Sequence, residues 1–305
     1  MPAYERFVGL FLFRDREPVL VVPALEREAA EATGLSVRTY TDAEGPENAV
    51  REAVGTARGP LGVEKHALTL DWAERLGEWL GVSRWVDVAP QVRRLRMIKD
   101  AQEVETLRKA ALVADRVLEA ALQHFRVGMT ELDLVAELEL QARRAGADGM
   151  AFSPLVLSGP RSALPHGVPG PNTIEPGSLL LIDFGIRING YHSDITRTFA
   201  VGSADERMRR VYEAVLASQN AALEAIRPGI TCAELDAWPG SRWPTPDTAP
   251  TSPTAWDTAW GWPCTSRHPS TAETMCRSSR AWSSPLSRAC TCRGGVACAS
   301  RTCAG

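Results

Sequence analysis

Apolar and polar residues alternate along residues 179–199 as expected for two β-strands that each bury one face. One alternating set is apolar and is predicted to be core: Leu180, Ile182, Phe184, Ile186, Ile195 and Phe199. Asn189-Gly190, between the two strands, is typical of a two-residue type I′ turn, because both central residues of that turn need a positive φ. The pattern therefore predicts an antiparallel hairpin that turns at this dipeptide.

The other face of the predicted hairpin carries two carboxylates. With the loop at the Asn-Gly dipeptide, Ile188 pairs with Tyr191, and Asp183 lies opposite Thr196. Asp194 then falls on the same face, diagonal to Asp183 and within reach of one shared metal cluster. This geometry favours a metal site, although aspartate pairs on hairpins are also commonly solvated, and the pattern alone leaves that alternative open.

The remaining hydrophobic pattern predicts two further regions before residue 237. Residues 1–90 alternate short apolar runs with helical periodicity, which predicts a small α/β domain that is shortened at its start. Within it, strands are predicted at 8–13, 18–23 and 61–65, helices at 24–33 and 68–81, and a connection at 86–100. Residues 91–237 predict a helix at 100–126, a second helix capped by Thr130, and a third at 205–226. The apolar stripe of the first of these is Val104, Leu107, Ala111, Ala114, Leu118 and Leu122.

The composition changes abruptly at about Ala237. Residues 238–305 hold six Trp, six Cys, ten Ser and seven Arg, but one Leu, one Val and no Ile, Phe, Tyr or Lys. So little aliphatic volume cannot pack a compact core, which predicts a disordered tail. The tail cysteines form no CxxC pair, so a structural zinc module is not favoured.

Charge and targeting signals exclude several classes of protein. Residues 1–237 carry a formal charge of −7 and the tail +4, and no basic helix interleaved with aromatic residues precedes the tail, so no nucleic-acid partner is expected. The only apolar stretch near the start is the short FVGLFLF, and no run approaches membrane-spanning length. We therefore expect a cytoplasmic protein with no membrane partner.

Four segments resemble a known metallopeptidase family. They are RMIKDAQEVETLRKAA, SALPHGVPG, LLLIDFG and GYHSDITRTFAVG. The chain resembles the family of prolidase, aminopeptidase P and methionine aminopeptidase, whose catalytic domain has the pita-bread fold, and the α/β domain at its start favours the creatinase/prolidase branch. The resemblance implies the α/β (α+β) fold class: a creatinase-like domain at 1–90, the first part of a truncated pita-bread domain at 91–237, and an aberrant tail at 238–305.

The resemblance also implies roles for individual residues. Asp183 and Asp194 would be the first two of five ligands to two divalent ions, which could be Mn²⁺, Co²⁺ or Zn²⁺. His166 would help to bind substrate beside the metals, and Thr196 would orient the Asp183 carboxylate, unless it is an ordinary strand residue. The implied substrate is a short peptide with proline at P1′, cleaved by a dipeptidase or an aminopeptidase, and a homodimer is plausible by resemblance alone.

The family's other three ligands, one His and two Glu, follow residue 237 and have no recognisable counterpart here. We hypothesise that the tail is the family sequence translated in the wrong frame. When the reading frame begins one base earlier, the last base of the Trp256 codon and the first two bases of the Asp257 codon form GGA, which encodes glycine. With GC-rich codon choices, residues 254–266 then read HGLGHGVGLAVHE. Residues 281–303 likewise become GMVFTVEPGLYLPGWGGVRIEDL, which supplies the missing motifs in family order. Loss of one C near Ala237 would produce this shift.

As written, the chain keeps two of five ligands. We therefore expect weak or no metal binding and no peptidase activity. A different class of function stays open: a non-catalytic binding protein on the same fold, which would need an ordered replacement for the lost half.

Overall fold

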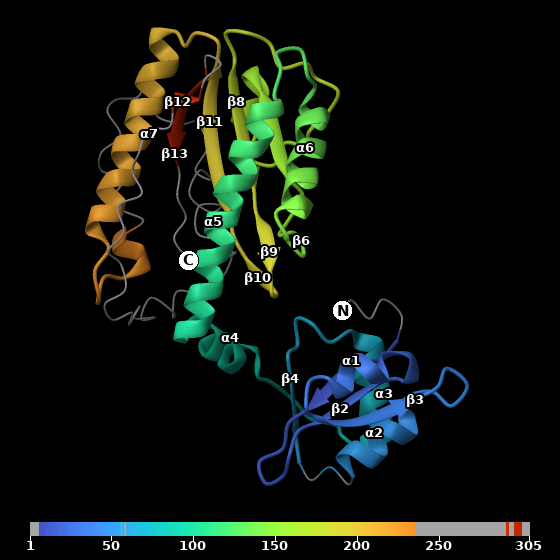
Figure 1. Ribbon diagram of the computed structural model, residues 1–305. Coiled ribbons are helices and arrows are strands. Elements are labelled where there is room, and N and C mark those ends of the chain that lie inside the picture. Colours follow the sequence, from blue (N-terminus) through green and yellow to red (C-terminus); the bar gives the residue numbers. More distant parts are fainter. Residues whose placement is uncertain (1–5, 56, 58, 236–290, 293–295, 301–305) are drawn as a thin grey trace. The chain divides into compact units, whose positions relative to one another are not determined.

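The computed structural model describes residues 6–55, 57, 59–235, 291–292 and 296–300 (Figure 1). The chain divides into two compact units, Met1–Met97 and Ile98–Gly305. Helix α4 (Ala89–Met97) belongs to the first unit, so that unit extends somewhat beyond the boundary predicted near residue 90. In the described part of the chain, no helix is long and apolar enough to cross a membrane.

The first unit is a small α/β domain, as predicted. Its strands are β1 (Gly9–Phe11), β2 (Val19–Pro23), β3 (Ser36–Tyr40), β4 (Leu61–Val63) and β5 (Trp85–Asp87). Its helices before α4 are α1 (Arg27–Glu31), α2 (Glu47–Val54) and α3 (Leu70–Leu80), with a 3₁₀ turn, η1, at Ala24–Glu26. Strand β2 pairs antiparallel with β1 and parallel with β3, and β1 and β2 confirm the strands predicted at 8–13 and 18–23.

Four elements of this unit were not predicted from the sequence. Strand β3 and helix α2 lie in a stretch without a clear period, and their order comes from packing: Tyr40 and Val50 are buried in the same core as Val21. The predicted connection at 86–100 is also wrong in part, because β5 pairs in parallel with β4 and α4 follows directly.

The second unit packs helices against a five-stranded sheet and contains a second, three-stranded sheet. Its helices are α5 (Ala101–His124), α6 (Glu131–Arg144) and α7 (Glu206–Ala225), with a 3₁₀ turn, η2, at Gly159–Ala163. Its strands before residue 237 are β6 (Gly149–Met150), β7 (Leu155–Ser158), β8 (Leu179–Phe184), β9 (Ile186–Ile188), β10 (Tyr191–His192) and β11 (Ile195–Val201). Capping boxes start the first two helices, at Asp100 with Glu103 and at Thr130 with Asp133, which confirms the predicted cap.

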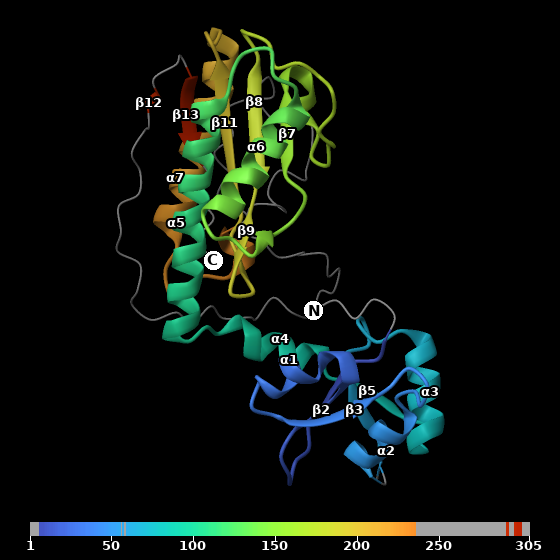
Figure 2. The ribbon, with the colours of Figure 1, turned by 45° about the vertical axis from the view of Figure 1, so that its right-hand side comes forward.

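Helices α5 and α6 lie side by side along one face of the sheet (Figures 1 and 2). The predicted core set is confirmed, since Ile182, Phe184 and Phe199 are at most 1% exposed and contact both helices' apolar residues. The buried stripe of α5 differs from the prediction and shares only Ala114 and Leu118 with it. Small side chains occupy most of this stripe because the helix lies close to the sheet, so the largest aliphatic residues do not mark its innermost face.

Two short strands, β12 (Thr291–Cys292) and β13 (Val296–Ser300), extend this sheet, in the order β12-β13-β11-β8-β7. The edge of β11 explains this pairing, because an exposed edge strand accepts any chain with free backbone donors and acceptors. The predicted disorder of the tail as a whole stays a prediction. The rest of the tail lies outside the described residues.

Gly185 joins β8 to β9 and allows the chain to approach its hairpin partner closely. A Cβ added there would overlap the carbonyl oxygen of Ser193 and lie 3.0 Å from the ring of Phe152. The partner segment is held in place, because the Ile186 N–H donates to the Ser193 Oγ at 3.0 Å and the Ser193 N–H donates to the Ile186 oxygen at 2.9 Å. The close approach of the two chain segments at Gly185 and Ser193 therefore leaves no space for a side chain at position 185.

We expect Gly185→Ala to lower the free energy of unfolding by about 1–3 kcal/mol, because the clash is with backbone that cannot move aside. Gly149→Ala is the matched control, since an added Cβ there meets the ends of two flexible side chains, Arg187 at 3.3 Å and Arg143 at 3.8 Å. Urea denaturation of both variants measures the difference. Equal stability of the two variants would show that this close approach can open at little cost.

Candidate metal centre

The predicted register of the hairpin is confirmed. Strands β8 and β11 run antiparallel with Asp183 opposite Thr196, and Ile188 of β9 pairs with Tyr191 of β10. Asn189 and Gly190 have φ values of 49° and 79°, as a type I′ turn requires. Asp194 directly precedes β11, two positions before Thr196, so the alternation of β11 continued by one residue would place it on the same face as Asp183.

We call this side of the sheet, with Asp183, Asp194 and Thr196, the Asp face. All three residues are half-buried, and the Oδ1 atom of Asp183 has essentially no accessible surface. Hard carboxylate oxygens on one face fit a divalent cation such as Mn²⁺. Over the part of the chain that the structure describes, however, no set of three His, Cys, Asp or Glu residues is placed to hold an ion. The two aspartates therefore form an incomplete donor set within those residues.

The opposite face holds β11 against α5 through an ion pair. Arg197 is 7% exposed and its Nη2 donates to Asp115 Oδ1 at 3.3 Å. Burial raises the pKa of Asp115, and the Arg197 guanidinium partly offsets that rise. This pairing joins α5 to the strand that presents Thr196.

The hairpin tip is anchored to the same helix. The Tyr191 hydroxyl donates to Glu103 Oε1 at 2.8 Å, while Glu103 Oε2 accepts the N–H of Asp100 at 2.7 Å. The hydrogen bond to Glu103 raises the pKa of Tyr191. One glutamate therefore completes the cap of α5 and holds the turn.

His166 lies in an exposed turn after η2, within the segment 158–172, which we call the His166 loop. Leu157 of β7 pairs with Leu181 of β8, so its side chain lies on the Asp face. A Cβ added to Gly167 would come within 2.5 Å of the Leu157 side chain, so the backbone next to His166 rests on that side chain. The structure thus brings the His166 loop onto the same face as the two aspartates.

One carboxylate, that of Glu131 at the start of α6, holds this loop. Glu131 is 0% exposed. Its Oε1 accepts the Ser158 N–H at 3.0 Å and the Arg161 Nε–H at 3.1 Å, and the same Nε lies 3.3 Å from Oε2. Its Oε2 accepts the Gly170 N–H at 3.0 Å and the Asn172 Nδ2–H at 3.1 Å. Four donor groups along the loop therefore converge on one side chain.

Two opposing effects set the charge of Glu131. Burial by itself raises its pKa, but the donors on Ser158, Asn172, Gly170 and Arg161 together outweigh burial and leave the pKa below its ordinary value. Glu131 is therefore an anion at neutral pH, and its charge is met by hydrogen bonds and by the guanidinium.

Comparison with known proteins decides the family. Residues 105–238 match the metallopeptidase family M24, and residues 3–98 match the creatinase/prolidase N-terminal domain. The chain belongs to metallopeptidase family M24. It is 36% identical over 230 residues to an Xaa-Pro dipeptidase of Pyrococcus furiosus, and this match covers 75% of the chain and 64% of the relative. The chain thus spans about two thirds of the length of such relatives.

Solved structures agree with this assignment. A prolidase from Pyrococcus furiosus superposes with a TM-score of 0.70 at 35% identity, covering 77% of this chain and 67% of that one. An X-Pro aminopeptidase from Thermotoga maritima superposes with a TM-score of 0.71 at 28% identity and the same coverages. The predicted fold class is therefore confirmed: a creatinase-type N-terminal domain followed by an M24 domain of the pita-bread kind.

In this M24 chain, sequence reasoning missed Glu131, Arg161 and Asn172. Glu131 directly follows the cap residue Thr130, where acidic residues are common because they complement the helix dipole, so its type at this position does not indicate burial. Its donors lie 27 to 41 positions further along the chain, and no local pattern links them. A capped helix start can therefore conceal a buried carboxylate.

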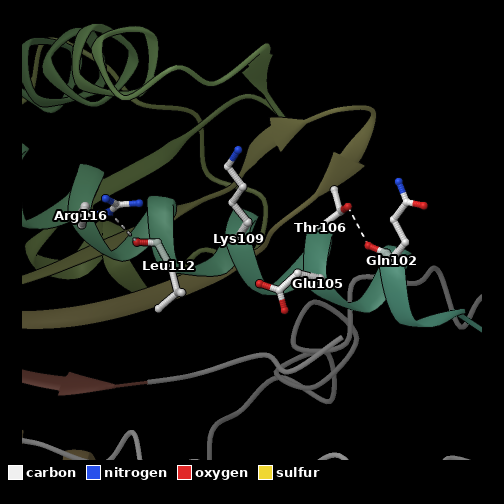
Figure 3. Close-up of a pocket in the computed structure, with 6 residues that line it drawn as sticks. All are labelled: Gln102, Glu105, Thr106, Lys109, Leu112 and Arg116. Atoms are coloured by element: carbon white, nitrogen blue, oxygen red, sulfur yellow. Dashed lines mark hydrogen bonds between the residues drawn. The ribbon is translucent and has the colours of Figure 1, made fainter.

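A shallow hollow lies elsewhere on this unit, along α5 (Figure 3). It is lined by Gln102, Glu105, Thr106, Lys109, Leu112 and Arg116. In Figure 3 these side chains point in different directions from successive turns of one helix, and the dashed hydrogen bonds join Thr106 to Gln102 and Arg116 to Leu112. No chemical groups converge there, and neither aspartate is part of it.

The burial of Glu131 predicts a pH-dependent stability. Because its pKa in the folded state lies below the ordinary value of 4.5, its contribution is present above about pH 4.5 and is lost as the pH falls through the folded-state pKa. We expect Glu131→Gln to lower the free energy of unfolding by about 2–4 kcal/mol at pH 7. The difference from wild type should shrink as the pH falls below about 4.

Urea denaturation between pH 3 and 7 measures this difference. Glu139→Gln is the control, since Glu139 is an exposed residue of the same helix and the charge change is identical. A gap between the two variants that does not depend on pH would contradict an ionised Glu131.

Proposed function

We propose that the chain derives from a dinuclear Xaa-Pro dipeptidase or aminopeptidase and that, as written, it is inactive. The observation that supports this proposal is the register that sets Asp183 of β8 opposite Thr196 of β11, with Asp194 directly before β11, in an M24 domain. The relatives named above support the substrate class, a short peptide with proline at P1′.

In this proposal each residue of the Asp face has a distinct role. Asp183 and Asp194 would hold two divalent ions, Mn²⁺, Co²⁺ or Zn²⁺, and Thr196 would orient the Asp183 carboxylate from the opposite strand. When bound, such ions polarise a scissile carbonyl and lower the pKa of a water. His166 is exposed on its turn and would donate a hydrogen bond to the substrate.

The inactivity follows from the missing ligands. The M24 match ends at residue 238, where the composition changes, and the rest of the chain supplies none of the family's motifs in its own frame. The rephased reading restores one His and two Glu at positions where this chain has Thr258, Ser287 and Arg301. We therefore attribute the tail to a one-base frameshift near Ala237.

A non-catalytic binding protein on the same fold is the second candidate. The observation that favours it is β13, which pairs with β11 and so adds order to the sheet from within the tail. Limited proteolysis separates the two candidates, because an evolved replacement resists digestion. Rapid loss of the tail back to about residue 237 would exclude it.

Resequencing codons 236 to 239 and assaying two proteins tests the main proposal. We expect the present chain to leave Ala-Pro uncleaved with added Mn²⁺, Co²⁺ or Zn²⁺. A gene with one base restored should encode an active hydrolase that loses activity in Asp183→Asn, because that change removes one metal ligand. Cleavage by the present chain, absent from its own Asp183→Asn variant, would refute the inactivity.

Metal affinity provides a test that does not need turnover. We expect the present chain to bind Mn²⁺ more than about 100-fold more weakly than the restored protein. Removing a residue that merely hydrogen-bonds to a metal ligand typically costs about 10- to 100-fold in metal affinity, and here ligands themselves are missing. Electron paramagnetic resonance of free Mn²⁺ measures both. Asp194→Asn should remove the residual binding, whereas Asp205→Asn, which keeps the cap of α7, should not. Equal affinities would contradict the assigned ligands.

A further inference from the structure

We propose that Glu131 is a positioning residue that holds the His166 loop across the Asp face and thereby sets the place of His166. This inference rests on the proposed function, in which His166 meets the substrate. Glu131 itself lies at the start of α6, is fully buried and does not reach solvent. Its role would therefore be exerted entirely through the loop.

The hydrogen bonds of Glu131 fix the loop at both ends. Ser158 ends β7 and bonds to Oε1, while Gly170 and Asn172 lie near the far end of the loop and bond to Oε2. The two ends of a segment that surrounds His166 are thus tied to the two oxygens of one carboxylate. Such a clamp restricts the intervening residues without any contact to His166.

Arg161 extends the clamp to the middle of the loop. Its Nε donates to Glu131, and its Nη2 donates to the carbonyl oxygen of Val168 at 2.5 Å. Val168 is two positions from His166, and Gly167 between them rests on Leu157 of the Asp face. The chain of contacts from Glu131 through Arg161 to Val168 therefore ends next to His166.

The geometry of the acceptors makes Glu131→Gln a selective test. Both carboxylate oxygens accept donors, so either orientation of a glutamine amide would place its NH₂ against at least two N–H groups. The backbone bonds from the N–H groups of Glu131 and Leu132 to the loop oxygens of Asn172 and Gly170 remain in the variant. The helix start is therefore preserved while the clamp is broken.

Hydrogen exchange and NMR of the full chain test the proposal. In Glu131→Gln we expect the amides of Ser158 and Gly170 to exchange at least about tenfold faster, the effect of losing one ordinary hydrogen bond. The His166 imidazole signal, assigned with His166→Gln, should shift and narrow as the loop becomes mobile. Glu139→Gln should change neither. Unchanged exchange and an unchanged His166 signal in Glu131→Gln would overturn the proposal.

Arg161→Gln is the second variant, in case Glu131→Gln does not fold. Arg161 is one-third exposed and its loss leaves the bonds to Ser158 and Gly170 in place. We expect faster exchange at Gly167 and Val168 and the same shift of the His166 signal, with α6 amides unaffected. A His166 signal identical to wild type would overturn the link through Val168.

Added Ala-Pro dipeptide separates this inference from the proposed function. In wild type the dipeptide should perturb the His166 imidazole signal, and failure to do so refutes the substrate role of His166. That outcome does not affect the exchange measurements, which test only whether Glu131 holds the loop. If Glu131 positions His166 for substrate, the dipeptide concentration needed for half of the change in the His166 signal should rise at least about tenfold in Glu131→Gln. An equal response in both proteins would limit Glu131 to a structural role.

Discussion

The register of the hairpin formed by β8 to β11 is the constraint on which both faces of the second unit depend. Because side chains alternate with a period of two, a slip of one residue would bring Asp183 into the core and expose Ile182 on the Asp face. Burying an ionised carboxylate among aliphatic side chains costs far more than any strand pairing returns. The positive φ values of Asn189 and Gly190 and the close approach at Gly185 select the same register independently.

Two carboxylates of this unit, Asp115 on α5 and Glu131 on α6, meet their charge in different ways. On the core side, Arg197 and Asp115 form one bond between a strand and a helix, and Asp115 still has a raised pKa because the pair does not fully offset burial. Glu131 instead receives donors from four residues and keeps a lowered pKa. A carboxylate bound this fully gains little by moving, which suits it to hold an irregular loop in one conformation.

Sequence patterns predicted the parts of the molecule whose causes are local. The Asn-Gly turn and the alternation around it determine which residues face Asp183, and a side-chain cap marks where α6 begins. The buried stripe of α5 differs from the predicted one because burial depends on how closely the helix approaches the sheet. Alanine side chains permit a close approach, and the periodicity of large apolar residues does not reveal it. Glu131 escaped prediction for a related reason: its burial depends on a loop that returns from about 40 residues away.

The core of the second unit is built from residues before 237, so the fold of this region does not require the tail. The core face of the hairpin is closed by α5 and α6, and all of these elements precede the tail. The Asp face, by contrast, is only half-buried, and within it the Oδ1 atom of Asp183 has essentially no accessible surface. Similarity to M24 relatives over this region therefore reflects the inherited fold, whereas the proposed metal chemistry would depend on residues that complete the donor set on the Asp face.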